Sequence, residues 1–283
     1  GNIGFHKHMS MFAKITKTCS GKPITEWMRA NANMRLLNEC SFKYLANATK
    51  ILVNGCWVGV VDDPINVKNL LINSRRNGLI SIYNSISWEI KSNTIYIYTD
   101  SGRLCHPVYY INNVIEKNNT VNKLSINNKQ ILTDILNNDF TWINLISGFS
   151  KKKTDFNVNK LEVYMNIQDL YDTSDLSTLK NTQAVIEYID TAEEETTLFC
   201  ANEEELNKKP YTHMEIHPSA ILGVMGNQII FPENNPLPRD LFSCGQSKQA
   251  ISIYHTNYDT RFDKMGVVLN YGQIPIVKSR YLK

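Results

Sequence analysis

The stretch ILVNGCWVGVVDDPINVKNLLINSRRNG, residues 51–78, is the most informative part of the chain for its fold. Two runs rich in β-branched residues flank Asn54-Gly55, a pair that readily takes the positive φ angles of a tight hairpin turn. The sequence therefore predicts a β-hairpin over residues 51–60.

A helix is predicted directly after the hairpin. Asp63 suits the N-cap position, and Pro64 suits the first turn, where the missing N–H is not needed. Val67, Leu70 and Leu71 give the helix one apolar face. Gly78, after Arg75 and Arg76, is the expected stop signal. The order in this part of the chain is hairpin, then helix.

The flanking sequence extends this unit on both sides. Residues 1–45 show an imperfect helical stripe, and three runs separated by turn residues predict strands over 86–90, 94–98 and 104–111. A polar stretch without periodicity follows, so we expect a boundary near residue 119. A second unit runs to about residue 210, with a predicted helix over 129–136, a solvated loop at Lys151-Lys152-Lys153 and a predicted strand over 184–189.

The sequence changes character after Tyr211. An apolar run over 220–230 is followed by FPENNPLP, residues 231–238, which we interpret as a rigid loop because prolines interrupt any regular helix. The whole chain is predicted to be α+β and multidomain, with mixed small sheets, helices and a β-rich C-terminal part.

The composition is that of an ordinary globular protein, with 42% hydrophobic and 20% charged residues among 283. We find no apolar window of membrane-spanning length and no signal-peptide core over residues 1–20, so we expect a soluble, unsecreted protein. The net charge of +3 is too small for nucleic-acid binding by charge alone. Six cysteines without a C-x-x-C pair are expected to be reduced thiols.

His213-Met214-Glu215-Ile216-His217 has the histidine spacing of a zinc-protease helix, but Met214 stands where the general base should follow the first histidine. Pro218 also prevents a helix from continuing. In an extended segment the two histidines would lie about 13 Å apart, too far to share one ion. We expect no zinc here and interpret the segment as a buried, hydrogen-bonded His-Glu-His network.

No phosphate-binding glycine loop or hydrolase elbow is present in the sequence, so catalysis within this chain has no recognisable centre. Arg239, in the proline-rich loop, could pair bidentately with a phosphate, although chemistry alone favours an exposed surface arginine. Lys248 and Gln249 lie in a small polar stretch that could face a phosphate and sugar backbone.

The segment YTHMEIHPSAILGVMGNQIIFPENNPLPRDLFSCGQSKQA, residues 211–250, resembles the second-largest subunit of multisubunit DNA-dependent RNA polymerases of the eukaryotic and archaeal type. Four further segments resemble the same family and follow the same order as in it: ILVNGCWVGV at 51–60, TDSGRLCHPV at 99–108, VIEYIDTAEEETTLFCA at 185–201 and TNYDTRFDKMGVVLNYGQIPIV toward the terminus. Weaker similarity over residues 3–15 extends the match to nearly the whole chain, and residues 119–183 are the least alike.

The resemblance implies four parts: the end of the fork region at 1–20, external domain 1 at 21–118, external domain 2 at 119–211 and the start of the hybrid-binding domain at 212–283. The family's acidic motif near the catalytic magnesium and its C-terminal zinc-binding cysteines are missing, so the chain is expected to be a segment of a larger subunit. Mg²⁺ would then be bound mainly outside this segment, with no zinc within it and no catalytic residue of its own.

The resemblance also implies roles for the candidate residues. Arg239 would contact the triphosphate of the incoming nucleotide, and Lys248 and Gln249 would lie along the RNA-DNA hybrid. Partners would be the largest subunit and other polymerase subunits, with DNA template, RNA transcript and nucleoside triphosphates, and no membrane. The Asn and Ile usage favours a polymerase of a large eukaryotic DNA virus, located in host cytoplasm and virion, over a cellular nuclear enzyme. The alternative is a free-standing scaffold made of the external domains, without a catalytic role.

Overall fold

The computed structural model describes residues 9–116, 119–126, 132, 135–136, 142–147 and 183–251. The chain forms two compact units, which we call the sheet unit, Ala13–Ile216, and the C-terminal unit, Gly1–Phe12 with His217–Lys283. The finer division into four domains stays a prediction. No helix in the described ranges is long and apolar enough to cross a membrane.

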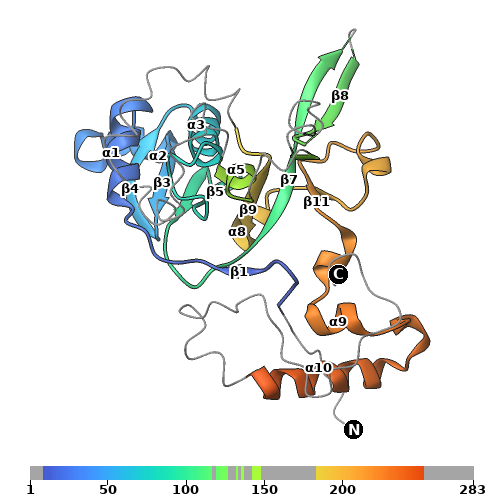
Figure 1. The fold of residues 1–283 in the computed structure, drawn as a ribbon. Coiled ribbons are helices and arrows are strands. Elements are labelled where there is room, and N and C mark those ends of the chain that lie inside the picture. The colour runs from blue at the N-terminus through green and yellow to red at the C-terminus, as the bar shows by residue number, and fades with distance from the viewer. Residues whose placement is uncertain are drawn as a thin grey trace. The chain divides into compact units, whose positions relative to one another are not determined.

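The sheet unit combines strands and helices (Figure 1). Its strands are β1 Lys14–Ile15, β2 Arg35–Leu36, β3 Thr49–Val53, β4 Cys56–Val61, β5 Ser85–Glu89, β6 Thr94–Tyr98, β7 Leu104–Glu116, β8 Asn119–Leu124, β9 Ile186–Asp190, β10 Phe199–Cys200 and β11 His213–Glu215. Its helices are α1 Lys22–Asn31, α2 Phe42–Asn47, α3 Pro64–Arg76, α5 Trp142–Ser147 and α8 Thr191–Glu194, with 3-10 turns η1 Leu37–Glu39 and η3 Glu203–Glu205. The α+β prediction is confirmed.

The predicted hairpin forms β3 and β4, joined by Asn54 and Gly55 with φ angles of 49° and 81°. The side chain of Asn54 also accepts a hydrogen bond from the Thr99 backbone N–H at 2.7 Å. The turn is therefore hydrogen-bonded to the residue that follows β6. The local turn sequence and this contact distant in the chain both favour the same hairpin conformation.

The predicted helix is confirmed as α3. The Asp63 carboxylate accepts a hydrogen bond from the Asn66 backbone N–H at 3.1 Å, and Pro64 occupies the first turn. Gly78 follows the helix with a φ angle of 69°, where a side chain would be strained.

The first sheet has the strand order β2-β4-β3-β6-β5, in which β3 and β6 are parallel. Helices α1 and α3 share one apolar core with this sheet. The buried side chains of that core include Ile24, Trp27, Met28, Val67, Leu70, Leu71, Ile51, Val53, Ile95 and Ile97. This packing fixes α3, whose last turn carries Arg75 and Arg76, against the sheet.

The second sheet is organised by the long strand β7, which pairs with β1, β8, β9 and β11, while β10 pairs with β11. The expected boundary near residue 119 falls at the start of β8, which pairs antiparallel with β7. Residues on both sides of that position therefore belong to one sheet. The pairing of β7 with β9 and β11 also brings residues 186–190 and 213–215 beside the first half of the chain.

The described residues of the C-terminal unit are helical, with η4 Pro218–Ile221, α9 Val224–Gln228, η5 Pro232–Asn234 and α10 Leu237–Ile251. The expected β-rich character is wrong for residues 218–251. The apolar run forms turns closed by the Asn227 side chain, whose amide donates to the carbonyl oxygens of Ser219 and Gly223, each at 3.1 Å. Backbone hydrogen bonding is satisfied locally there, without strand pairing.

The interpretation of residues 231–238 as a loop is partly wrong. Helix α10 already begins at Leu237 and includes Pro238, because a proline in the first turn removes an N–H that has no helical partner anyway. Most of the predicted helix over 129–136 and all of the Lys151-Lys152-Lys153 run lie outside the described residues.

Candidate functional site

The three candidate residues Arg239, Lys248 and Gln249 lie on one helix, α10. Arg239 is in its first turn, where the backbone N–H donates to the carbonyl oxygen of Pro236 at 2.9 Å. Its side chain is exposed, and within the described ranges it has no hydrogen-bond or ion-pair partner. The guanidinium is thus presented to solvent from a helix, where sequence reasoning expected a loop.

The helix separates these residues. Positions 239 and 248 are nine residues apart, which corresponds to two and a half turns and about 13 Å along the axis. The two positions therefore lie on opposite sides of the helix. The structure brings positions 239 and 248 into one element but not onto one face of it.

His213 and Glu215 belong to strand β11, which confirms the extended conformation expected for this segment. The expected His-Glu-His network is wrong in its partners. His213 lies 2.7 Å from Glu187 of β9 and Glu215 lies 3.3 Å from His106 of β7, so each pairs with a neighbouring strand rather than with the other. Within the described ranges, no three His, Cys, Asp or Glu side chains are grouped as metal ligands.

His217 belongs to the C-terminal unit rather than to the sheet unit. Its Nδ1 accepts a hydrogen bond from the Ser219 backbone N–H at 3.1 Å and lies 2.7 Å from the Ser219 hydroxyl. This histidine therefore caps the 3-10 turn η4.

A buried ion network joins the end of α3 to β9 and α8. The Arg75 guanidinium donates to both oxygens of Glu193, at 2.6 and 2.8 Å, and to Glu187 at 3.0 Å. Arg76 donates to both oxygens of Glu187, each at 3.0 Å, and stacks on the Tyr110 ring at 3.6 Å. The side chains of Arg75 and Glu187 are each only 2% exposed, so these pairs are shielded from water.

The network determines the charge state of its members. Burial alone would raise the pKa of Glu187, but Arg76, the hydrogen bond from His213 and Arg75 outweigh it and hold that pKa well below the usual range. Burial likewise works against a charged Arg75, yet the adjacent Glu193 and Glu187 carboxylates raise the pKa of its guanidinium. Both groups therefore stay ionised in the folded protein.

A second ion pair also joins the end of β9 to the first half of the chain. Arg103 donates to Asp190 at 2.9 Å, and the other Asp190 oxygen accepts from the Ser85 hydroxyl at 2.6 Å and from the Glu193 backbone N–H at 3.0 Å. Asp190 is thus the N-cap of α8 and also accepts a hydrogen bond from β5 of the first sheet. Together the two groups of contacts hold β9 and α8 against the first half of the chain.

Replacement of Glu187 by glutamine should make stability depend less on pH. A carboxylate with a lowered folded pKa stabilises the protein above its unfolded pKa of about 4.3, and this contribution is lost as pH falls through the folded value. We expect Glu187→Gln to be clearly less stable than the wild type at pH 7, with a difference that shrinks below pH 4. Urea unfolding followed by tryptophan fluorescence at pH 7, 5, 4 and 3 measures it, and a constant difference would contradict the assignment.

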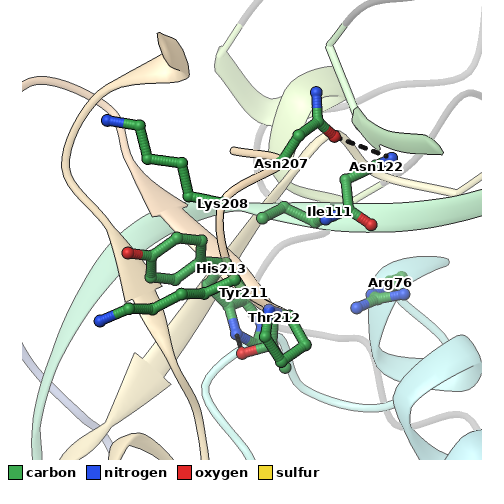
Figure 2. Close-up of a pocket in the computed structure, with 10 residues that line it drawn as sticks. Arg76, Ile111, Asn122, Asn207, Lys208, Tyr211, Thr212 and His213 are labelled. Atoms are coloured by element: carbon green, nitrogen blue, oxygen red, sulfur yellow. Dashed lines mark hydrogen bonds between the residues drawn. The ribbon is translucent and has the colours of Figure 1, made fainter. Parts of the chain in front are cut away.

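Arg76 and His213, which belong to the network, also line an open pocket of about 810 Å³ in the sheet unit. Figure 2 shows Lys208, Tyr211 and His213 on one side of this pocket and Arg76 across from them, with Asn122 and Asn207 joined above. The described residues that line it are Arg76, Ile111, Asn122, Asn207, Lys208, Lys209, Pro210, Tyr211, Thr212 and His213. It combines cationic, amide and aromatic groups.

Sequence reasoning missed both the network and the pocket. Arg75 and Arg76 were assigned only to the end of a helix, and Glu187 only to a predicted strand. The available signal was a charged residue within the otherwise apolar run AVIEYI, residues 184–189, since a carboxylate in a buried strand requires a cationic partner.

Comparison with known proteins places these features in a family context. Residues 51–112, which run from β3 into β7, match the family described as RNA polymerase Rpb2, domain 4. The chain is 29% identical over 318 residues to DNA-directed RNA polymerase II subunit RPB2 of Schizosaccharomyces pombe, covering 99% of this chain and 23% of that protein. It is 31% identical over 295 residues to DNA-directed RNA polymerase II subunit 2 of Arabidopsis thaliana, covering 99% and 21%.

A viral protein is also among the relatives. DNA-directed RNA polymerase subunit 2 of Acanthamoeba polyphaga mimivirus is 28% identical over 287 residues, covering 99% of this chain and 22% of the relative. The chain spans about a fifth of the length of the relatives it matches. Over nearly its whole length, the chain is therefore similar in sequence to a segment of the second-largest, RPB2-type subunit of DNA-directed RNA polymerases.

Proposed function

We propose that this chain is part of the second-largest subunit of a multisubunit DNA-directed RNA polymerase and contributes to template-directed RNA synthesis. The observation that carries the proposal is the similarity over 99% of the chain to polymerase subunits of a yeast, a plant and a virus. The partners would be the largest subunit and the other subunits, together with DNA template, RNA transcript and nucleoside triphosphates.

Within that enzyme, Arg239 would contact the triphosphate of the incoming nucleotide, and Lys248 and Gln249 would lie along the RNA-DNA hybrid. The exposed side chain of Arg239 and its position in the first turn of α10 support this role, since a guanidinium pairs bidentately with phosphate. The positions of Arg239 and Lys248 on opposite sides of the helix fit two different neighbours, one a nucleotide and the other the hybrid.

The catalytic Mg²⁺ of such an enzyme would be bound mainly outside this segment, as the resemblance implies, and no zinc is expected within it. The described residues contain no ligand cluster that fits either ion. By the same resemblance, this chain would position nucleotide and nucleic acid, while the largest subunit would supply the catalytic carboxylates.

The purified 283-residue chain alone is expected to be inactive in RNA synthesis. Two-metal phosphoryl transfer requires carboxylates that hold both ions and a cleft that aligns the reacting groups, and the proposed segment supplies neither. The measurement is incorporation of labelled nucleotide on a preassembled RNA-DNA scaffold in the presence of Mg²⁺. Template-dependent incorporation by this chain would contradict the assignment.

Affinity purification of the full-length protein that contains this segment tests the proposed function. We expect the largest polymerase subunit to be recovered in equal amount and the complex to incorporate nucleotides on a DNA template. Recovery of the protein without other polymerase subunits would favour the alternative, a scaffold made of the external domains.

We further propose an intracellular location, in the nucleus if the protein is cellular and in host cytoplasm and virion if it is viral. The mimivirus relative supports a viral origin, together with the heavy use of Asn and Ile. Detection of the full-length protein in purified virions would test this origin.

A further inference from the structure

Among the residues that the structure describes, the charged groups lining the pocket in the sheet unit are all cationic or can become so. These lining residues include Arg76, Lys208, Lys209 and His213, and no described aspartate or glutamate. The carboxylate nearest to this wall, Glu187, is 2% exposed and lies behind Arg76 and His213. A ligand in the pocket would therefore encounter positive charge.

Two of these charges are available for a ligand. Arg76 and His213 are both hydrogen-bonded to Glu187 already, so neither side chain is available for a ligand. Among the described residues, Lys208 pairs only with the partly exposed Glu205, at 3.7 Å, and its own side chain is 65% exposed. Lys209 is exposed, and among the described residues no carboxylate pairs with it. The excess positive charge of the pocket thus resides on the two lysines.

The rest of the lining suits a polypeptide. Ile111, Pro210 and Tyr211 offer apolar surface. The Asn122 amide nitrogen already donates to Leu206 and the Asn207 amide oxygen already accepts from the Asn122 backbone, which leaves the Asn122 oxygen and the Asn207 nitrogen to pair with peptide groups. A volume of about 810 Å³ accommodates several residues of an extended segment, since ligand pockets range from roughly 300 to 1,000 Å³.

The surroundings of the pocket disfavour a nucleic acid. Glu203, Glu204 and Glu205 form the 3-10 turn η3, which directly precedes the two lysines in the chain. A phosphate backbone carries a negative charge at every nucleotide, so a strand continuing beyond the pocket would meet these carboxylates. A peptide can place acidic residues on the lysines and neutral residues beside η3.

We propose that this pocket binds an acidic segment of a partner protein. Two or more aspartate or glutamate side chains would pair with Lys208 and Lys209, and an adjacent apolar residue would pack on Tyr211. The proposal does not depend on the role of Arg239 or on polymerase activity, since it rests only on the pocket in the sheet unit.

Fluorescence anisotropy with the 283-residue chain tests the proposal. The probes are a fluorescein-labelled acidic decapeptide with three adjacent glutamates and one leucine among glutamines, its counterpart with the glutamates replaced by glutamine, and a ten-nucleotide single-stranded RNA, each at low and at physiological salt. We expect the acidic peptide to bind most tightly, more weakly as salt increases, and with a Kd that rises about 3- to 30-fold in the double variant Lys208→Gln/Lys209→Gln.

The matched control is Lys43→Gln/Lys91→Gln, which removes the same charge from two exposed lysines outside the pocket. It should leave the Kd for the acidic peptide within about twofold of the wild type. Three results would each overturn the proposal: equal binding of the acidic peptide and its glutamine counterpart, tighter binding of the RNA, or an equal loss in the control variant. All four substitutions are at exposed positions, so both variants should fold.

Discussion

Replacement of Arg75 by methionine is expected to lower the free energy of unfolding of the chain by about 3 to 5 kcal/mol. The substitution removes both hydrogen bonds to Glu193 and one to Glu187, and Glu193 is then left buried without its bidentate partner. Methionine has a similar length and helix propensity, so the loss measures the missing charge rather than a cavity. Urea unfolding at pH 7 followed by tryptophan fluorescence gives the value.

Two further variants make this experiment decisive. Arg29 pairs with Glu39 on the surface, where the two side chains are 52% and 45% exposed, so Arg29→Met should cost about 1 kcal/mol or less. The double variant Arg75→Met/Glu193→Gln should recover part of the loss, because no full charge then remains unpaired at Glu193. Equal losses for Arg75→Met and Arg29→Met would show that the buried network does not stabilise the fold.

Sequence reasoning succeeded where structure is determined by neighbouring residues. The Asn54-Gly55 turn and the Asp63-Pro64 helix start each depend on backbone conformations or hydrogen bonds within a few residues. Helix and strand periodicity similarly marks which faces of these elements are apolar. The first sheet and its core could therefore be predicted in outline.

The buried network could not be predicted in the same way. Arg75 and Glu193 are 118 residues apart, and a local pattern gives no information about which strand will pack beside the end of α3. Arg75 also has an ordinary local explanation, since basic residues are favoured in the last turn of a helix. Partner choice in this case depends on the pairing of β7 with β9, a contact that is distant in sequence.

The placement of Arg239 shows a different source of error. Two prolines within three residues suggested a loop, yet the same rule that placed Pro64 in a first turn also allows Pro238 in the first turn of α10. Arg239 therefore lies on a helix, which positions its side chains more rigidly than a loop does.

In the complete polymerase, Arg239→Ala is expected to lower kcat/KM for nucleotide addition by roughly 10- to 150-fold. The proposed contact is charge-assisted and bidentate, which corresponds to about 1.5 to 3 kcal/mol of transition-state binding. Alanine is compatible with the first turn of α10, and the side chain is exposed, so assembly of the enzyme should be preserved. Arg239→Lys should recover only part of the loss, because an ammonium keeps the charge but not the planar fork.

The measurement is single-nucleotide extension on a preassembled RNA-DNA scaffold at subsaturating nucleotide, with the wild type, both Arg239 variants and Arg35→Ala. Arg35 is also an exposed arginine, but it lies in the sheet unit, so its loss should leave the extension rate unchanged. Wild-type rates for Arg239→Ala would identify Arg239 as an ordinary surface arginine. Loss of the assembled complex would instead assign it a structural role. A large loss in Arg239→Ala, a smaller one in Arg239→Lys and none in Arg35→Ala would be specific to a guanidinium that binds phosphate, because a general change in surface charge would affect all three variants alike.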